Sequence, residues 1–193
     1  MKTQIRTRKR NSQTAGYSII ELLVAMGIIS LLSAFAAPSL VSAYHGYQMD
    51  DLASQVATQL KFTRYEAIRR NNVMTCLDKS QNGYLTMFTD FNGDGTVQNT
   101  EKQIKFSGSG TLVDAGSVPG SGSLAGVVNA GTLTTISPSN GTITFDGRGA
   151  KSTAGVSVYW VGNANLGWRA VTVMPSGSVQ VWSYVATTWK QLS

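Results

Sequence analysis

The feature that most constrains this chain of 193 residues is an apolar run over residues 17–37, which contains a single charge, Glu21. As an α-helix the run would be about 30 Å long, which is the thickness of the hydrocarbon core of a bilayer. Beyond Pro38 apolar residues recur at helical spacing, with polar residues between them. The pattern predicts one helix over about 17–71 that is apolar first and amphipathic over 38–72.

The positive charge lies mainly in front of this run. The net charge is +6, of which residues 1–16 carry +5. A basic leader before an apolar run is a targeting pattern, and its basic residues stay on the cytoplasmic side of a membrane. The single cysteine and single histidine exclude an intrachain disulfide and a multi-histidine metal site. A secretory signal peptide cut after Ala36 is an alternative, because small residues precede that position.

The start of the apolar run resembles the processing site of type IV pilins and type II secretion pseudopilins. The resemblance rests on the basic leader, Gly16, Glu21 as the fifth residue after it, and Pro38 as the twenty-second. It implies that prepilin peptidase cuts after Gly16, that Tyr17 is N-methylated, and that Glu21 and Pro38 serve assembly. A carboxylate in hydrocarbon is costly and marks a functional site. The alternative is that Glu21 lies at a ragged edge of a membrane helix.

The second half of the predicted helix resembles GspH/FimT minor pilins, a group that includes FimU-like subunits. Two later stretches, 141–150 and 168–181, resemble the C-terminal strands of that family. The resemblance implies an α+β, type IV pilin-like fold, in which the long helix packs on a C-terminal antiparallel sheet domain. The helical match is carried by Arg64, Glu66, Ala67, Ile68, Arg70 and Asn71.

Residues 73–193 form the expected β-rich head domain. Short alternating runs rich in valine, threonine and aromatic residues predict strands. Residues 107–141 are rich in glycine and low in charge, which predicts a loop region. The expected strands are Val73–Leu77, Tyr84–Thr89, Gln103–Phe106, Thr142–Phe145, Val156–Val161, Arg169–Val173 and Val179–Trp182.

Residues 90–101 fit the spacing of a calcium-binding loop. Hard oxygen donors favour Ca²⁺ over a transition metal, and Gly95 provides the sharp turn. The alternative is a tight turn between two strands, closed by Asp and Asn side chains. The expected donors are Asp90, Asn92, Asp94, Thr96, Gln98 and Glu101.

The sequence contains no nucleophile elbow and no zinc-protease helix, so we expect that the protein is not an enzyme. Arg148 and Lys151 lie in a glycine-rich turn and are the candidates for contacts with DNA. Two positive charges are weak evidence for DNA binding, because non-specific affinity for DNA grows with the number of phosphates contacted.

The sequence therefore predicts a structural minor pilin that initiates or caps a type IV pilus. The alternatives are a type II secretion pseudopilin and a pilus-borne DNA receptor for uptake. The expected partners are prepilin peptidase, other pilin subunits and the inner membrane. The precursor would cross the inner membrane once, with a cytoplasmic N-terminus and a periplasmic head, before it joins the fibre at the cell surface.

Overall fold

We analysed a computed structural model of the whole chain, which describes residues 17–81, 84–107, 112–113, 118–137 and 140–192. The chain divides into two compact units, Met1–Val41 and Ser42–Ser193, and each is described by itself. The expected leader, residues 1–16, lies outside the described residues.

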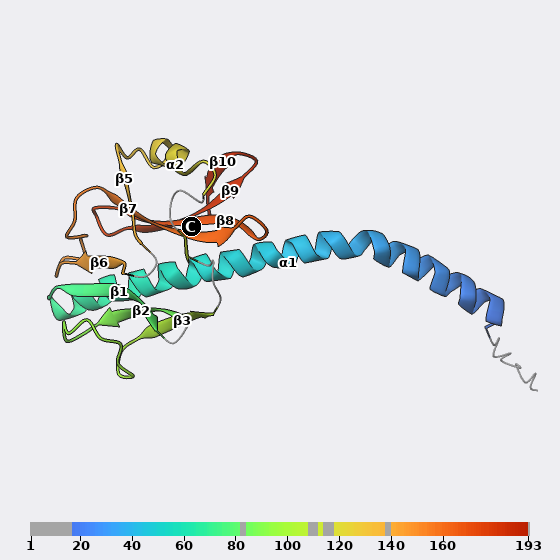
Figure 1. Cartoon of the computed structure of the whole chain (residues 1–193), viewed down its shortest axis with the longest axis horizontal. Coiled ribbons are helices and arrows are strands. Elements are labelled where there is room, and N and C mark those ends of the chain that lie inside the picture. The colour runs from blue at the N-terminus through green and yellow to red at the C-terminus, as the bar shows by residue number, and fades with distance from the viewer. Residues whose placement is uncertain (1–16, 82–83, 108–111, 114–117, 138–139, 193) are drawn as a thin grey trace, which may run out of the picture. The chain divides into compact units, whose positions relative to one another are not determined.

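One helix, α1, runs from Ile19 to Arg70, which confirms the expected long helix to within two residues at its start (Figure 1). Its end is set by asparagine. Asn71 has a φ of 48°, a left-handed conformation that asparagine tolerates better than most residues. The N–H of Asn72 then donates to the carbonyl of Ala67 at 3.1 Å, which satisfies one of the last carbonyls of the helix.

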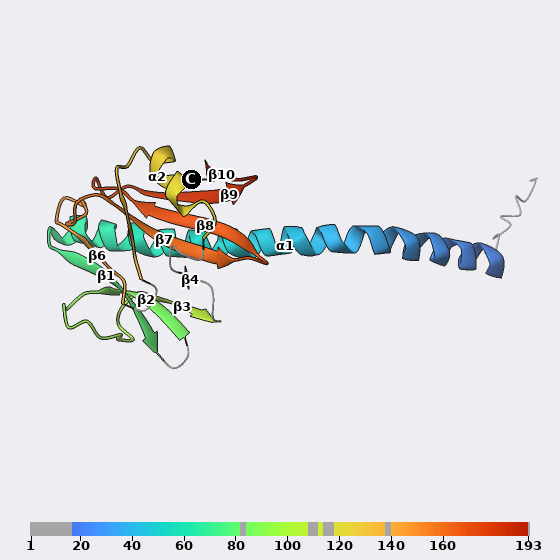
Figure 2. The same cartoon turned by 45° about the horizontal axis from the view of Figure 1, so that its top comes forward.

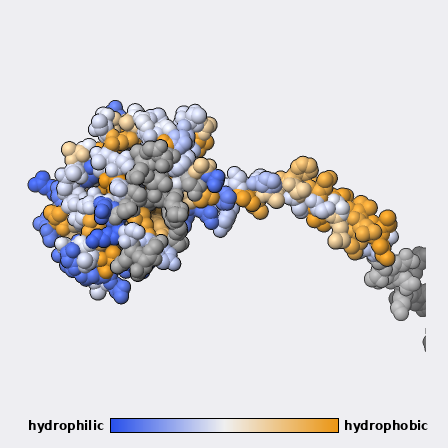
Figure 3. All heavy atoms as spheres, viewed as in Figure 1, coloured by the Kyte–Doolittle hydropathy of each residue, from blue (hydrophilic) through white to orange (hydrophobic). Residues whose placement is uncertain are grey.

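In the first unit, every described residue up to Val41 is exposed. Figure 3 shows the apolar surface that this part of α1 presents. Among the described residues, α1 is the one helix long and apolar enough to cross a membrane. Three serines in this part donate their hydroxyls to carbonyls three or four residues back, so these polar groups are satisfied inside the helix: Ser30 to Gly27, Ser33 to Ile29 and Ser39 to Ala36.

The described residues of the second unit form two sheets. The first, which we call sheet A, has the order β3-β2-β1-β6, and every neighbouring pair is antiparallel. Its strands are β1 (Met74–Gln81), β2 (Tyr84–Asp90), β3 (Gln103–Ser107) and β6 (Thr142–Phe145).

The second sheet, sheet B, has the order β10-β9-β8-β7-β4, and its neighbouring pairs are antiparallel. The short strand β5 also pairs with β7, and it does so in parallel. The expected antiparallel sheet is therefore confirmed apart from this one pair. The strands are β4 (Leu112–Val113), β5 (Leu133–Thr135), β7 (Val156–Asn163), β8 (Gly167–Val173), β9 (Val179–Val185) and β10 (Thr188–Gln191).

The part of α1 that follows Met49 lies between the two sheets (Figures 1 and 2). Counted from Ala53, the next buried apolar residues lie three, four and seven positions on, so they form one face of the helix. Sheet A contributes Phe106 and Phe145 to the same core, and sheet B contributes Tyr159 and Val171. The helix residues of this core are Ala53, Val56, Ala57, Leu60 and Ala67.

A second core covers the other face of sheet B. Trp160, Trp182 and Trp189 pack there against Leu124 of a short helix, α2 (Ser121–Val127). The expected loop over 107–141 is therefore wrong in part, because β4, α2 and β5 lie within it. The helix depends on distant contacts: the carbonyl of Gly120, just before α2, accepts a hydrogen bond from Trp189 Nε1 at 2.9 Å.

Candidate assembly and processing site

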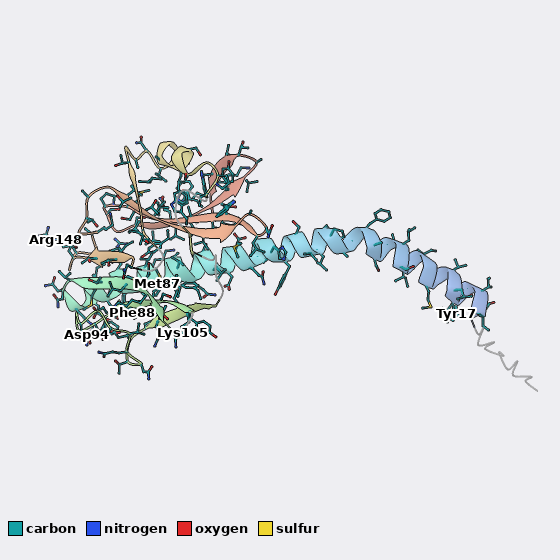
Figure 4. The ribbon with its side chains drawn as sticks, in the orientation of Figure 1. Tyr17, Met87, Phe88, Asp94, Lys105 and Arg148 are labelled. Carbon is teal, nitrogen blue, oxygen red and sulfur yellow. The ribbon has the colours of Figure 1, made fainter. Side chains whose placement is uncertain are left out.

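The expected processing residues stand at the start of α1. Gly16 lies outside the described residues, and Tyr17 is the first residue that the structure describes (Figure 4). The Tyr17 side chain is 83% exposed, and Glu21 is the acidic residue of the first helical turn. The carbonyl of Ser18 accepts a hydrogen bond from the N–H of Leu22 at 3.1 Å, which ties the processing segment to the helix.

Glu21 is the one charged residue between Tyr17 and Val41. The large apolar side chains around it are more than half exposed, among them Ile20 and Leu23. Pro38 lies inside α1, which continues on both sides of it. A proline lacks the N–H that an interior helical residue donates, so the helix loses one hydrogen bond here without ending.

The other end of α1 is fastened by Arg64. Its Nε donates to the carbonyl of Gly149 at 2.8 Å, and its Nη2 donates to the carbonyl of Ser176 at 3.3 Å. These carbonyls belong to the β6–β7 and β8–β9 turns. A Cβ on Gly177, whose φ is +78°, would lie 1.8 Å from the Gly149 carbonyl oxygen. The two turns therefore approach one another so closely that only glycine fits at position 177.

Glu66 organises the last turn of the helix. Its carboxylate accepts hydrogen bonds from Arg69 Nη2 at 2.6 Å and from Arg70 Nε at 3.0 Å. The hydrogen bond from Arg69 is the main reason why the pKa of Glu66 lies below its usual value, and burial opposes this effect. The guanidinium of Arg70 also lies over the ring of Phe91, 4.4 Å from its centroid. Arg64 and Arg70, two residues of the segment that resembles GspH/FimT minor pilins, thus hold the end of α1. Arg64 binds the β6–β7 and β8–β9 turns, and Arg70 contacts the β2–β3 loop.

The β2–β3 loop closes on two buried carboxylates. Asp90 accepts hydrogen bonds from the backbone N–H groups of Asn92, Gly93 and Gly95 at 3.2, 2.6 and 2.9 Å. At the other end of the loop, Glu101 accepts from the N–H of Phe91 at 3.0 Å and of Gln98 at 3.2 Å. Both carboxylates are therefore occupied by the loop backbone.

Asp94, at the tip of the loop, has its own local partners (Figure 4). It accepts hydrogen bonds from the N–H and hydroxyl of Thr96, both at 2.7 Å, and these lower its pKa. Within the residues that the structure describes, no three His, Cys, Asp or Glu side chains are grouped as a metal would require. As placed, the expected donors form the tight turn between two strands, and calcium binding by this loop stays a prediction.

The expected DNA contacts differ in exposure. Arg148 is exposed (Figure 4). Lys151 is 6% exposed, and its Nζ donates to Ser157 Oγ at 2.8 Å. Burial lowers the pKa of this amine. The expectation that Lys151 offers a surface charge to a phosphate is therefore wrong, because its amine is buried and bonded to Ser157 of β7.

Two further features escaped sequence reasoning. Arg169 of β8 pairs with Asp50 of α1, with Nε and Oδ1 2.5 Å apart, although the two residues are far apart in the chain. Asp78 of β1 is 1% exposed, and burial raises its pKa to about 7. Alternation along β1 was the available signal, because Met74 and Cys76 also face inward.

Comparison with known proteins identifies two segments. The family of type II transport proteins GspH matches residues 52–177, and the prokaryotic N-terminal methylation motif matches residues 11–37. A comparison with curated proteins found no match.

Two crystal structures of the type IV minor pilin FimU from Pseudomonas aeruginosa (strain PAO1) are similar to the chain. The structure in space group P21 has 10% identity and a TM-score of 0.46, and covers 75% of this chain and 93% of its own. The structure in space group P65 has 11% identity and a TM-score of 0.47, with 68% and 90% covered. The family assignment rests on the two sequence matches.

The matched segments contain the features described above. The methylation motif includes Gly16, Tyr17 and Glu21, and the GspH match includes Arg64 and Glu66. The motif implies processing by prepilin peptidase and assembly with other pilin-type subunits. The GspH match covers more than half of the chain, so the chain belongs to the GspH family and is a minor pilin or pseudopilin.

Proposed function

We propose that the chain is a structural minor pilin that is cut after Gly16, methylated on the new amine of Tyr17, and built into a type IV pilus. Residues 17–37 hold it in the inner membrane before assembly, and the unit from Ser42 onward lies in the periplasm. The leader stays cytoplasmic because it carries the basic residues. The chain acts through binding surfaces and has no catalytic step of its own.

The observation that carries this proposal is the exposed apolar helix with one carboxylate in its first turn. Large apolar side chains over 19–41 have no partner within the described chain, so lipid or other helices must cover them. In hydrocarbon the Glu21 carboxylate needs a positive partner. Cleavage after Gly16 creates such a partner, an amine four residues before it, on the same subunit or a neighbouring one.

A pseudopilus of type II secretion is the second candidate, and the description of the matched family as a type II transport protein favours it. The two assemblies can be separated by where the mature chain is found. Mechanical shearing of cells releases surface pili, so a pilus subunit appears in the sheared fraction. A pseudopilus subunit stays with the cells, and its loss blocks secretion of folded proteins.

The central experiment determines the N-terminus of the mature chain by sequencing and mass spectrometry. We expect Tyr17 carrying one methyl group. A mature chain that begins at Ala37 would instead show a secretory signal peptide. The Gly16→Val variant should remain uncut, whereas Gly27→Val, the same change at a helical position with no atom within 4 Å of its Cβ, should be cut normally. Normal maturation of Gly16→Val would refute the proposal.

DNA uptake keeps little support, because only Arg148 of the expected pair is exposed. A gel-shift titration of the detergent-solubilised chain at low and high salt tests it. We expect no retardation that depends on Arg148. A salt-sensitive shift that is lost in Arg148→Ala would restore the receptor hypothesis.

A further inference from the structure

Among the described residues, one edge of sheet A has no paired strand. At the other edge, β6 is covered by the chain that follows it: the N–H of Ser152 donates to the carbonyl of Thr144 at 2.8 Å, and Phe145 forms a bridge with Lys151. On the outer side of β3, no strand of the described residues is paired. Figures 1 and 2 show β3 at this edge. An open edge presents unpaired backbone N–H and C=O groups.

The register identifies which groups point outward. The N–H of Thr89 donates to the carbonyl of Lys102 at 3.0 Å, so the backbone of Lys102 faces β2. In an antiparallel strand the direction of these groups alternates from residue to residue. Ile104 and Phe106 therefore also bond to β2, whereas the backbone groups of Gln103 and Lys105 point to the open edge.

A groove runs beside this edge. It has a volume of about 340 Å³ and lies between the solvent-facing side of α1 and the start of β3. Most of its lining residues are polar, among them Asp51, Ser54, Thr58 and Lys102, and Ile104 adds an apolar wall. A strand added to β3 would place alternate side chains over this groove and the others over the outer face of the sheet. The mixed lining suits short side chains such as threonine, which carry both a methyl group and a hydroxyl.

The lysines near this edge indicate which kind of strand can pair with β3. Lys105 is exposed on the outer face of sheet A (Figure 4), because Ile104 and Phe106 face the core. Lys102, on the groove side, has its Nζ 4.4 Å from the centroid of the Phe62 ring. Two copies of β3 paired antiparallel about the centre of the strand would bring Lys105 against Lys105. Like charges directly opposite are destabilising, so a second copy of this edge is disfavoured and a strand bearing carboxylates is favoured.

We propose that β3 and its groove accept an extended, carboxylate-bearing segment of another subunit of the same fibre by strand addition. The inference rests on the proposed function, in which the chain assembles with other subunits. Backbone hydrogen bonds to Gln103 and Lys105 provide the affinity, and a carboxylate opposite Lys105 sets the register.

Amide hydrogen exchange tests this on the full chain in detergent micelles. The probe is a capped synthetic peptide in which glutamate alternates with threonine, and a peptide with lysine for glutamate is its control. We expect the acidic peptide to slow exchange of the Gln103 and Lys105 amides by at least about tenfold, while the Ile104 and Phe106 amides, already bonded to β2, change little. Unchanged exchange with millimolar acidic peptide, or equal protection by the lysine peptide, would overturn the proposal.

Variants at one position separate backbone from charge. Lys105→Pro removes an outward N–H without removing a bond to β2, so it should abolish protection. If this variant does not fold, Lys105→Glu serves in its place and should transfer protection to the lysine peptide. The same preparation is incubated with prepilin peptidase. If the chain is cut after Gly16 but the acidic peptide does not protect the Gln103 and Lys105 amides, the proposed function stands and only the strand-addition site is refuted.

Discussion

Replacing Asp78 by asparagine should remove a large pH dependence of stability. Asp78 lies in the central strand β1, and neither of its carboxyl oxygens has a hydrogen bond of good geometry within the described residues. Burial is the main reason why its pKa rises from 3.8 to about 7, and the Tyr159 hydroxyl acts in the opposite direction. The folded chain therefore favours the neutral acid.

The direction in which stability changes with pH follows from which state, folded or unfolded, holds the Asp78 proton more tightly. Below pH 4 the carboxyl is protonated in both states and contributes nothing. Between pH 4 and 7 the unfolded chain releases the proton while the folded chain keeps it, so stability falls as pH rises. Each pKa unit corresponds to about 1.4 kcal/mol, so the loss reaches about 4 kcal/mol above pH 7. An asparagine side chain cannot ionise, so the Asp78→Asn variant lacks this slope.

The assay is urea denaturation of the full chain in detergent micelles, followed by tryptophan fluorescence at pH 4 and pH 8. A buried amide without a partner carries a cost of about 1–3 kcal/mol, but this cost is the same at both pH values. The informative quantity is therefore the change in the wild-type–variant difference between them, expected to be about 4 kcal/mol. The matched control is Asp51→Asn, at an exposed acid. A difference for Asp78→Asn that does not vary with pH would refute the reasoning.

Three further predictions concern the helix end and the β2–β3 loop. Gly177→Ala should lower the free energy of unfolding by at least about 2 kcal/mol, because the left-handed φ and the clash with the Gly149 carbonyl both oppose a Cβ. The control is Gly122→Ala, in a helix with open space around the new Cβ, which should be neutral or stabilising in the same urea titration. Glu66→Gln should flatten the fall of stability on acidification, since a depressed pKa stabilises the fold above the unfolded value and is lost as pH falls; an unchanged acid limb in the titration would contradict this. If the loop binds Ca²⁺, the ion should raise Tm in the wild type and not in Asp94→Ala, and no rise in the wild type would end the calcium prediction.

Most regular elements could be predicted from local patterns. Helical spacing of apolar residues defined α1, and alternation with β-branched residues indicated strands such as β9. The short helix α2 could not be predicted in this way. It has seven residues, two of them glycine, and only Leu124 is buried. Its position depends on Trp189, which lies 69 residues from Gly120 in the chain.

The candidate site divides in the same manner. The processing segment could be predicted because its features, a basic leader, a glycine and an apolar run, follow one another along the chain. Arg64 was recognisable as part of a resembling segment, but its partners Gly149 and Ser176 lie 85 and 112 residues away. Lys151 was expected at the surface and is buried. No local pattern carries these contacts, because they depend on which strands meet.

The sequence alone determined that the chain has a long helix with an apolar first half, a prepilin-type methylation motif and a β-rich domain. Those properties follow from charge order, length and periodicity, which are local along the chain. The tertiary structure decided which ionisable groups are available. It buries Asp78 and Lys151 and closes the loop carboxylates on backbone N–H groups. Within the described residues, it also leaves the outer edge of β3, which carries Lys105, without a paired strand. Burial and edge position are properties of packing between distant segments, and packing sets both the pKa of a group and its access to a partner.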